Sequence, residues 1–295
     1  MMQLIPNPNI PIKIIFEDES IIVIDKPAGM PCYPLKAGEK DTIANGLAAR
    51  SAEDTPKKKL LTKTCHSCES RNPVQFNALD PRFHGDDRHI EHFRGSYEAG
   101  IVHRLDNNTS GLLLAAKNQR AIDTLRAQFD GNKILKRYTA LVLGETPQKG
   151  VIETPIIHDP KDKKKMKISP LTPRHYTVGG RAALSHKGRG GLSAHTTYKL
   201  LKKYAGGQYS LLEVTIKTGV RHQIRVHLAS IGHPIAGDKL YLNTRQRMRD
   251  KTGLLRQFLH ASLLGFNHPS SGKRVEFSSP LPEELRNVLT NLKEI

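Results

Sequence analysis

The sequence predicts an α+β fold, and two kinds of periodicity carry this prediction. Residues 12–26, "IKIIFEDESIIVIDK", place β-branched runs on both sides of an acidic turn, which is typical of a β-hairpin. Residues 119–129, "QRAIDTLRAQF", instead place Ala121, Ile122 and Leu125 on one face of a helix. Strands and helices do not alternate regularly along the chain, so a doubly wound parallel sheet is not expected.

The remaining elements follow from the same patterns. Helices are expected over 42–52 and 222–232, and Asn118 is expected to cap the helix that follows it. The C-terminal segment predicts a strand and then a helix that starts at Ser279 or Leu281, with Pro282 near its first position. Further strands are expected over 112–117, 136–145, 195–204 and 209–217, and loops over the Lys-rich stretch 159–170 and the Gly-rich stretch 179–192.

Residues 53–99 interrupt this pattern. The segment is polar and shows neither helical nor strand periodicity, which predicts a flexible or disordered surface insertion within one domain spanning 1–295. Its sequence "SRNPV…LDPRFHGDD" resembles the translated palindromic repeats of bacterial genomes. A zinc site is the alternative, because the spacing of four side chains falls within the range of zinc ligands: Cys65, Cys68, His84 and His89. Prolines between them, and the lack of a helical apolar face, favour an insertion without metal.

Charge indicates a polyanionic partner. The 295 residues include 46 Lys and Arg against 28 Asp and Glu, a net charge of +18. Such a surface attracts nucleic acid, and the lysines gather in runs at 57–59 and 161–167 that suit phosphate contacts. No apolar stretch is long enough to span a membrane, and no basic amphipathic helix indicates a membrane surface. Three cysteines and the lack of a secretory signal predict a reducing, cytoplasmic location.

Five ordered segments carry a family resemblance. "HRLDNNTSGLLLAAK" at 103–117 resembles the signature of the RluA-type pseudouridine synthases. "KRYTALVLG" at 136–144 is similar to the second motif of that family, and "VTIKTGVRHQIRVHLASIGHPIAGDKLY" at 214–241 is similar to the third. Residues 18–34 and 258–282 are similar to the flanking segments. The resemblance implies the pseudouridine synthase fold, with a mixed, largely antiparallel central sheet and flanking helices and loops.

The resemblance also implies a reaction and its residues. Members of the family isomerise uridine in RNA by detaching uracil from ribose C1′ and rejoining it through C5, without metal or organic cofactor. Asp106 matches the catalytic carboxylate, Arg225 the cation that keeps it ionised, and Tyr138 the tyrosine that stacks on the target base. RNA contacts are expected from a second set of residues: Arg104, Arg221, His222 and Gln223. Of these, Arg104 matches an arginine of the family that fills the gap left by the flipped base.

Each of these residues has an ordinary structural alternative. Asp106 could cap the polar turn that follows it, as aspartate often does. Tyr138 could be a core residue of an alternating strand, and Arg225 a surface phosphate contact. His103 could orient a neighbouring side chain. The order of the five motifs favours the catalytic interpretation of Asp106.

One departure from the family pattern affects RNA recognition. Members commonly have arginine where this chain has Val220, and Arg221 follows one residue later. If the segment were a strand, this shift would move the side chain to the other face. The RNA contact made from position 220 is therefore in doubt.

Three other classes of protein were weighed against an RNA-modifying enzyme. A non-catalytic RNA-binding protein is disfavoured by the intact candidate residues, and a zinc-dependent nucleic-acid module depends on the cysteine pair. A glycosidase normally needs two carboxylates, and the resemblance gives a catalytic role to no acid other than Asp106. Fewer than fifteen residues precede the first strand, so no S4-type RNA-binding domain is expected there. The sequence leaves the substrate open between large-subunit rRNA and tRNA, and predicts a monomer.

Overall fold

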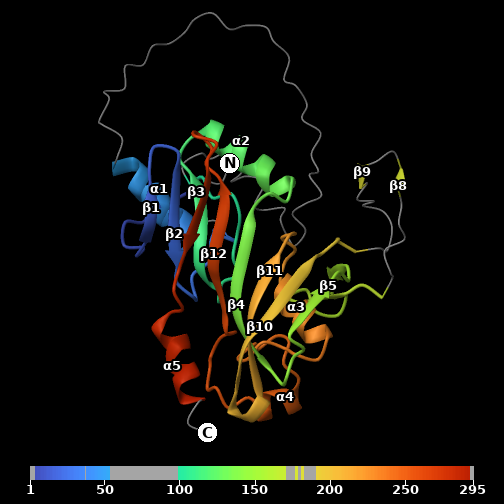
Figure 1. Ribbon diagram of the computed structural model, residues 1–295. Helices are drawn as coiled ribbons and strands as arrows, with labels where there is room; N and C mark the ends of the chain where they lie inside the picture. Colours follow the sequence, from blue (N-terminus) through green and yellow to red (C-terminus); the bar gives the residue numbers. More distant parts are fainter. Residues whose placement is uncertain are drawn as a thin grey trace, which may run out of the picture.

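A nine-stranded mixed sheet forms the centre of the molecule (Figure 1). The computed structural model describes residues 4–36, 38–53, 99–170, 177–178, 181–182 and 191–292. The strands run in the order β1-β2-β3-β12-β4-β11-β10-β5, with β13 paired to β12. All pairs are antiparallel except β3 with β12, which agrees with the predicted α+β class. The sheet strands are β1 (Lys13–Glu17), β2 (Ile21–Lys26), β3 (Ser110–Ala116), β4 (Leu135–Leu143), β5 (Lys149–Ile152), β10 (Thr196–Tyr204), β11 (Tyr209–Ile216), β12 (Leu259–Asn267) and β13 (Arg274–Ser278).

Two short hairpins, five α-helices and one short 3-10 helix (Ala205–Gly207) complete the described elements. The hairpins are β6 (Ile156–His158) with β7 (Met166–Ile168), and β8 (Thr177–Val178) with β9 (Arg181–Ala182). The helices are α1 (Ile43–Glu53), α2 (Gln119–Asp130), α3 (Gln223–Ser230), α4 (Thr244–Arg249) and α5 (Glu283–Asn291).

Helices cover both faces of the sheet around β2 and β3. Side chains alternate along a strand, so Ile22 and Ile24 join the core that also holds α1, α3 and α5, while Ile21 and Val23 pack with α2. This explains why β2 and β3 read as nearly continuous apolar runs, with every residue of β3 buried. Asn118 caps α2 as predicted, its side chain accepting from the amide of Ala121 at 2.9 Å.

A glycine allows β3 to lie beside β12. The two strands pair in parallel through Ser110 with His260 and Gly111 with Ala261. Gly111 has φ +113°, and a Cβ there would lie 2.3 Å from the carbonyl oxygen of Ala261. Any larger residue would therefore push apart the strands that lie directly behind the Asp106 turn.

Several sequence-based expectations need correction. The stretch 159–170, predicted as a loop, contains β7, and β9 lies inside the Gly-rich stretch 179–192. The C-terminal helix starts at Glu283, with Pro282 as its N-cap, because the residue before a proline is driven out of the helical region and Leu281 precedes Pro282. The central strand β12, the short strands β5, β6 and β8, and the short helix α4 were not anticipated.

The predicted insertion is shorter at both ends than expected. Glu53 belongs to α1, and Ala99 packs against the main core. Residues 54–98, which include all four candidate zinc ligands, lie outside the described residues. Among the residues that are described, no cluster of three or more histidine, cysteine or acidic side chains could hold a metal ion. None of the described helices is long and apolar enough to span a membrane.

Candidate active site

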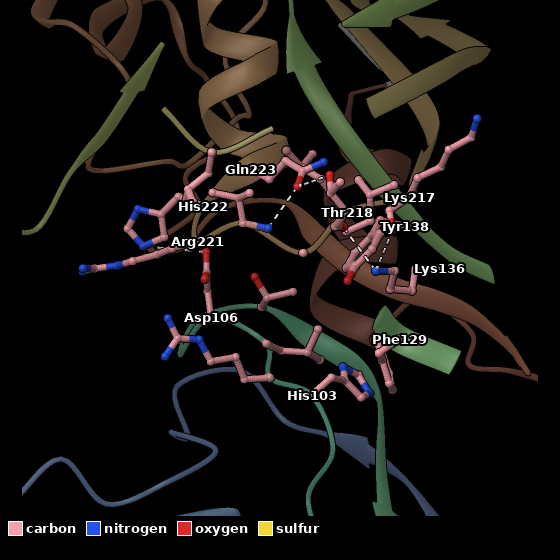
Figure 2. Close-up of a pocket in the computed structure, with 18 of the residues that line it drawn as sticks. His103, Asp106, Phe129, Lys136, Tyr138, Lys217, Thr218, Arg221, His222 and Gln223 are labelled. Atoms are coloured by element: carbon pink, nitrogen blue, oxygen red, sulfur yellow. Dashed lines mark hydrogen bonds and ion pairs between the residues drawn. The ribbon is translucent and has the colours of Figure 1, made fainter. Parts of the chain in front are cut away.

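A cavity of about 500 Å³ opens between the Asp106 turn, β4 and the turn that joins β11 to α3 (Figure 2). This volume is within the range of pockets that bind a nucleoside-sized ligand. Asp106 enters from one side and Tyr138 from β4 on the other. All the candidate residues line this one cavity: Arg104, Asp106, Tyr138, Arg221, His222, Gln223 and Arg225.

The turn that carries Asp106 is fixed by buried side chains beneath it. Its own backbone closes through the amide of Thr109, which donates to the carbonyl of Asp106 at 2.9 Å. Lys26, fully buried, donates to three carbonyls, of Pro27, Met30 and Asn107, at 2.8 to 2.9 Å. A buried ammonium group normally needs a counter-ion, and here carbonyl dipoles take that place. Lys26 thereby ties the end of β2 to the Asp106 turn.

Arg225 holds Asp106 in its charged form. Its Nη1 donates to Oδ2 of Asp106 at 2.9 Å, and the side chain of Asp106 keeps 25% of its surface exposed to the cavity. Burial alone would raise the pKa of Asp106, but the neighbouring His222 and Arg225, and the charge of Arg104, hold it below its usual value. Of His222 and Arg225, only Arg225 carries a positive charge at pH 7, because burial keeps His222 neutral.

A second carboxylate, which the sequence did not indicate, orients Arg225. Asp238 is fully buried and accepts from Nε at 2.7 Å and from Nη2 at 2.8 Å, so the guanidinium is held in a bidentate pair. The Oδ1 atom of Asp238 also accepts from the amides of Leu240 and Tyr241, at 3.0 and 3.3 Å. Burial would lower the pKa of Arg225, but the two carboxylates raise it above its ordinary value. The third nitrogen, Nη1, is the one that contacts Asp106.

His222 and Tyr241 form a hydrogen-bonded pair beside Asp106. The hydroxyl of Tyr241 accepts from the amide of Met166 at 2.9 Å and lies 2.8 Å from Nδ1 of His222. The Met166 amide can only donate, so the hydroxyl hydrogen remains available, and we assign it to Nδ1. In this assignment the imidazole proton lies on Nε2, which is 3.9 Å from Oδ2 of Asp106. Burial lowers the pKa of His222 to about 4, so the ring is neutral at pH 7.

Tyr138 presents its ring and hydroxyl to the cavity. The residue is 7% exposed and lies on β4 between Val214 and Ala261 of the neighbouring strands. Within the described part of the chain its hydroxyl makes no hydrogen bond. Burial, and then the charge of Asp106, raise the pKa of Tyr138 well above its usual value, so the phenol stays protonated. Stacking on a base stays a prediction.

The turn at 217–222 is not a strand, so the alternation argument for Val220 does not apply. Val220 packs into a small apolar cluster with Met166 and Val226, and Arg221 points away from it, donating to the carbonyl of Lys164 at 3.4 Å. The backbone turn, rather than strand register, thus decides the directions of the Val220 and Arg221 side chains.

The four predicted RNA contacts differ in their surroundings. Arg104 is exposed and Arg221 is half-buried, so both can reach a ligand at the mouth of the cavity. Gln223 is 3% exposed, and its amide is occupied by Thr218, the Val220 amide, the His195 carbonyl and Thr196. Its contacts hold the turn before α3 in place, and contact with RNA stays a prediction for all four residues.

Comparison with known proteins identifies the family. Residues 20–230 match the model of the RNA pseudouridylate synthase family. The chain belongs to that family. An uncharacterized RNA pseudouridine synthase of Chloroflexus aurantiacus is 36% identical over 92% of this chain and 66% of its own length. The ribosomal large subunit pseudouridine synthase D of Neisseria meningitidis serogroup A is 32% identical over 98% of this chain and 63% of its own length.

Solved pseudouridylate synthases have the same fold. The human protein named RNA Pseudouridylate Synthase Domain Containing 4 superposes with a TM-score of 0.64. The superposition covers 95% of this chain and 92% of that one, at 21% sequence identity. The domain containing 1 protein superposes with a TM-score of 0.59, covering 94% of this chain and 86% of that one. The chain spans about two thirds of the length of the two curated relatives above, at 66% and 63%.

Proposed function

We propose that this chain isomerises uridine to pseudouridine in structured RNA, with Asp106 as the catalytic carboxylate. The ion pair between Asp106 and Arg225 carries the proposal, because it supports a charged carboxylate in a cavity of nucleoside size. Membership of the RNA pseudouridylate synthase family supports the same reaction.

The proposed reaction breaks the C1′–N1 bond and forms a C1′–C5 bond, with no atom gained and no change in oxidation state. It needs no redox cofactor for that chemical reason. Asp106 acts on the sugar, either as a nucleophile at C1′ or as a base, while the ring of Tyr138 stacks on the uracil. The target nucleotide must leave the stack to enter the cavity, which costs a few kcal/mol and less in a loop.

Large-subunit rRNA is the substrate we propose, with tRNA as the alternative. Several relatives are named ribosomal large subunit pseudouridine synthase D, and the net charge of +18 suits a long RNA. We further propose a single catalytic domain that acts as a monomer in the cytoplasm, since Asp106, Tyr138 and Arg225 all come from one copy. Mapping pseudouridines in rRNA and tRNA from cells with and without the gene would distinguish the two substrates.

An isotope-release assay tests the reaction itself. Wild-type protein should release tritium from RNA that carries 5-tritiated uridine, whereas Asp106→Asn should release none and keep its fold and its RNA affinity. Asp123→Asn, an exposed position on α2, is the matched control and should behave as wild type. Substantial tritium release by the Asp106→Asn variant would contradict the catalytic role of Asp106. Absence of release by the wild type on every RNA tested would contradict the proposed isomerase function.

A further inference from the structure

A buried lysine lies on the cavity wall and has no role in the reaction as proposed above. Lys136 is 7% exposed and precedes Tyr138 by two residues on β4, so both side chains leave the strand on the same face. Figure 2 shows the two side chains ending close to each other inside the cavity, on the side opposite Asp106.

No acidic side chain in the described part of the chain neutralises the charge of Lys136. Its Nζ donates to the carbonyls of Lys217 at 3.3 Å and Thr218 at 3.1 Å, and lies 5.6 Å from the ring centre of Phe129. Within the described residues, no carboxylate lies within ion-pairing distance of Nζ. An ammonium group has three hydrogens, so one remains for a ligand, and buried charges are normally paired.

The depth of Lys136 favours the base rather than the RNA backbone as its partner. Two exposed cations, Arg104 and Lys217, lie at the rim of the cavity. The phosphates of a bound RNA must also stay at the rim, because they are joined to the rest of the RNA chain. Phe129 and Ile216 are apolar neighbours of Lys136 that line the cavity, and such surfaces suit a flat base with carbonyl groups at its edge.

We infer that Lys136 is a further catalytic group, which donates a hydrogen bond to a carbonyl oxygen of the target uracil and offsets the negative charge that forms on it. When the C1′–N1 bond breaks, its electron pair leaves with the uracil and spreads over N1, O2 and O4. The charge disappears when C5 bonds to C1′, and a proton then moves from C5 to N1. A fixed cation in a cavity of low polarity stabilises such an anion more than water does. The inference rests on the proposed isomerase function.

The pKa of Lys136 offers a readout. Desolvation lowers this pKa to about 8, so the free enzyme loses the ammonium charge as the pH rises above that value. The chemical step should therefore slow between about pH 8 and pH 10. The other ionisable side chains that line the cavity are His103, Arg104, Asp106, Asp130, Tyr138, Lys217, Arg221, His222 and Arg225.

Other groups could contribute to such a pH profile, so variants must separate them. The pKa of His103 is lowered to about 3, first by desolvation and then by Lys136, which keeps this ring neutral. Lys26, beneath the Asp106 turn, also has a pKa of about 8. A slowing at high pH in the wild type alone would not distinguish Lys26 from Lys136.

Lys136→Met tests the inference in the full-length enzyme. The single-turnover rate of tritium release should fall by roughly 10²–10³-fold, as for other groups that stabilise a developing anion. RNA affinity and its salt dependence should stay near the wild-type values, and the slowing at high pH should disappear. The thermal midpoint should be equal or higher, because methionine has a similar shape and removes an unpaired buried charge.

Two further variants complete the experiment. Lys273→Met removes an exposed lysine from the turn between β12 and β13 and should leave rate, affinity and midpoint unchanged. Lys136→Arg keeps a charge that does not titrate, so it should retain more activity than Lys136→Met and show no slowing from pH 8 to pH 10. This second variant decides the matter if Lys136→Met fails to fold.

Three results would overturn the inference. The first is a Lys136→Met rate equal to that of an active wild type. The second is weaker RNA binding with a salt slope smaller by about one and a normal chemical step, which would make Lys136 a phosphate contact. The third is a slowing at high pH that persists in Lys136→Arg, because the titrating group would then be a residue other than Lys136. Inactivity of the wild type itself would instead count against the proposed function.

Discussion

Arg225 binds Asp106 through a single nitrogen, Nη1, at 2.9 Å from Oδ2. The other two donors of the guanidinium are occupied by Asp238, at 2.7 and 2.8 Å, and the ring of Tyr241 lies 5.1 Å beneath its central carbon. The cation is therefore aimed at Asp106 by a fully buried carboxylate from a different segment. Substitution of Arg225 would affect two carboxylates rather than one.

The first prediction concerns Arg225→Met. Removing one partner of a buried ion pair leaves the other stranded, at a cost of about 3–5 kcal/mol in the free energy of unfolding. Asp238, which is fully buried, should bear most of this cost. The pKa of Asp106 is now held low; without Arg225, burial should raise it, so the residual rate should increase with pH as the ionised fraction recovers. Single-turnover rates and RNA affinities across pH would measure this.

A double variant serves as the control for stability. Arg225→Met with Asp238→Asn removes the stranded charge, so its thermal midpoint should recover part of the loss while its rate stays low. A normal chemical step in Arg225→Met, with weakened and less salt-sensitive RNA binding, would instead make Arg225 a phosphate contact.

The second prediction concerns Tyr241→Phe. The hydroxyl accepts from the amide of Met166 and donates to Nδ1 of His222, so its loss leaves a backbone donor of the β6–β7 hairpin unpaired. We expect a loss of about 1–3 kcal/mol in the free energy of unfolding. Nitrogen NMR of labelled histidine should show Nε2 protonated and Nδ1 unprotonated in the wild type near pH 7, and a mixture in the variant.

The control for this experiment is Tyr33→Phe, a tyrosine whose hydroxyl donates to the carbonyl of Ile101 away from His222. It should leave the His222 signals unchanged. A wild-type spectrum with the proton on Nδ1 would contradict the tautomer that the hydrogen-bond partners of Tyr241 indicate.

The third prediction concerns the segment between α1 and Ala99. If residues 54–97 are neutral to the fold, their replacement by a short Gly/Ser linker should preserve activity and the thermal midpoint, since long loops add little closure entropy. Metal analysis of the purified full-length protein should find no stoichiometric zinc. One zinc per chain, lost in the linker variant together with stability, would support the alternative in which Cys65 and Cys68 are ligands.

The sequence by itself determined many of the local elements and the family, although it did not indicate the central strand β12. Alternation of β-branched residues defined the β1–β2 hairpin, and the spacing of Ala121, Ile122 and Leu125 together with the Asn118 cap defined α2. The ordered motifs selected Asp106, Tyr138 and Arg225, which all line one cavity. These features are readable because they depend on neighbours within a few residues along the chain.

Tertiary structure alone decided which distant groups meet. Arg225 contacts Asp106 across 119 positions of sequence, and the parallel pairing of β3 with β12 brings the two halves of the chain together behind the Asp106 turn. Asp238 and Lys136 lie inside the matched motifs, yet nothing local distinguishes them from surface charges. Their importance comes from burial and from their partners: Asp238 is paired with Arg225, whereas Lys136 has only carbonyl acceptors among the described residues. Burial and partners both depend on long-range packing, which the periodicity of the sequence does not predict.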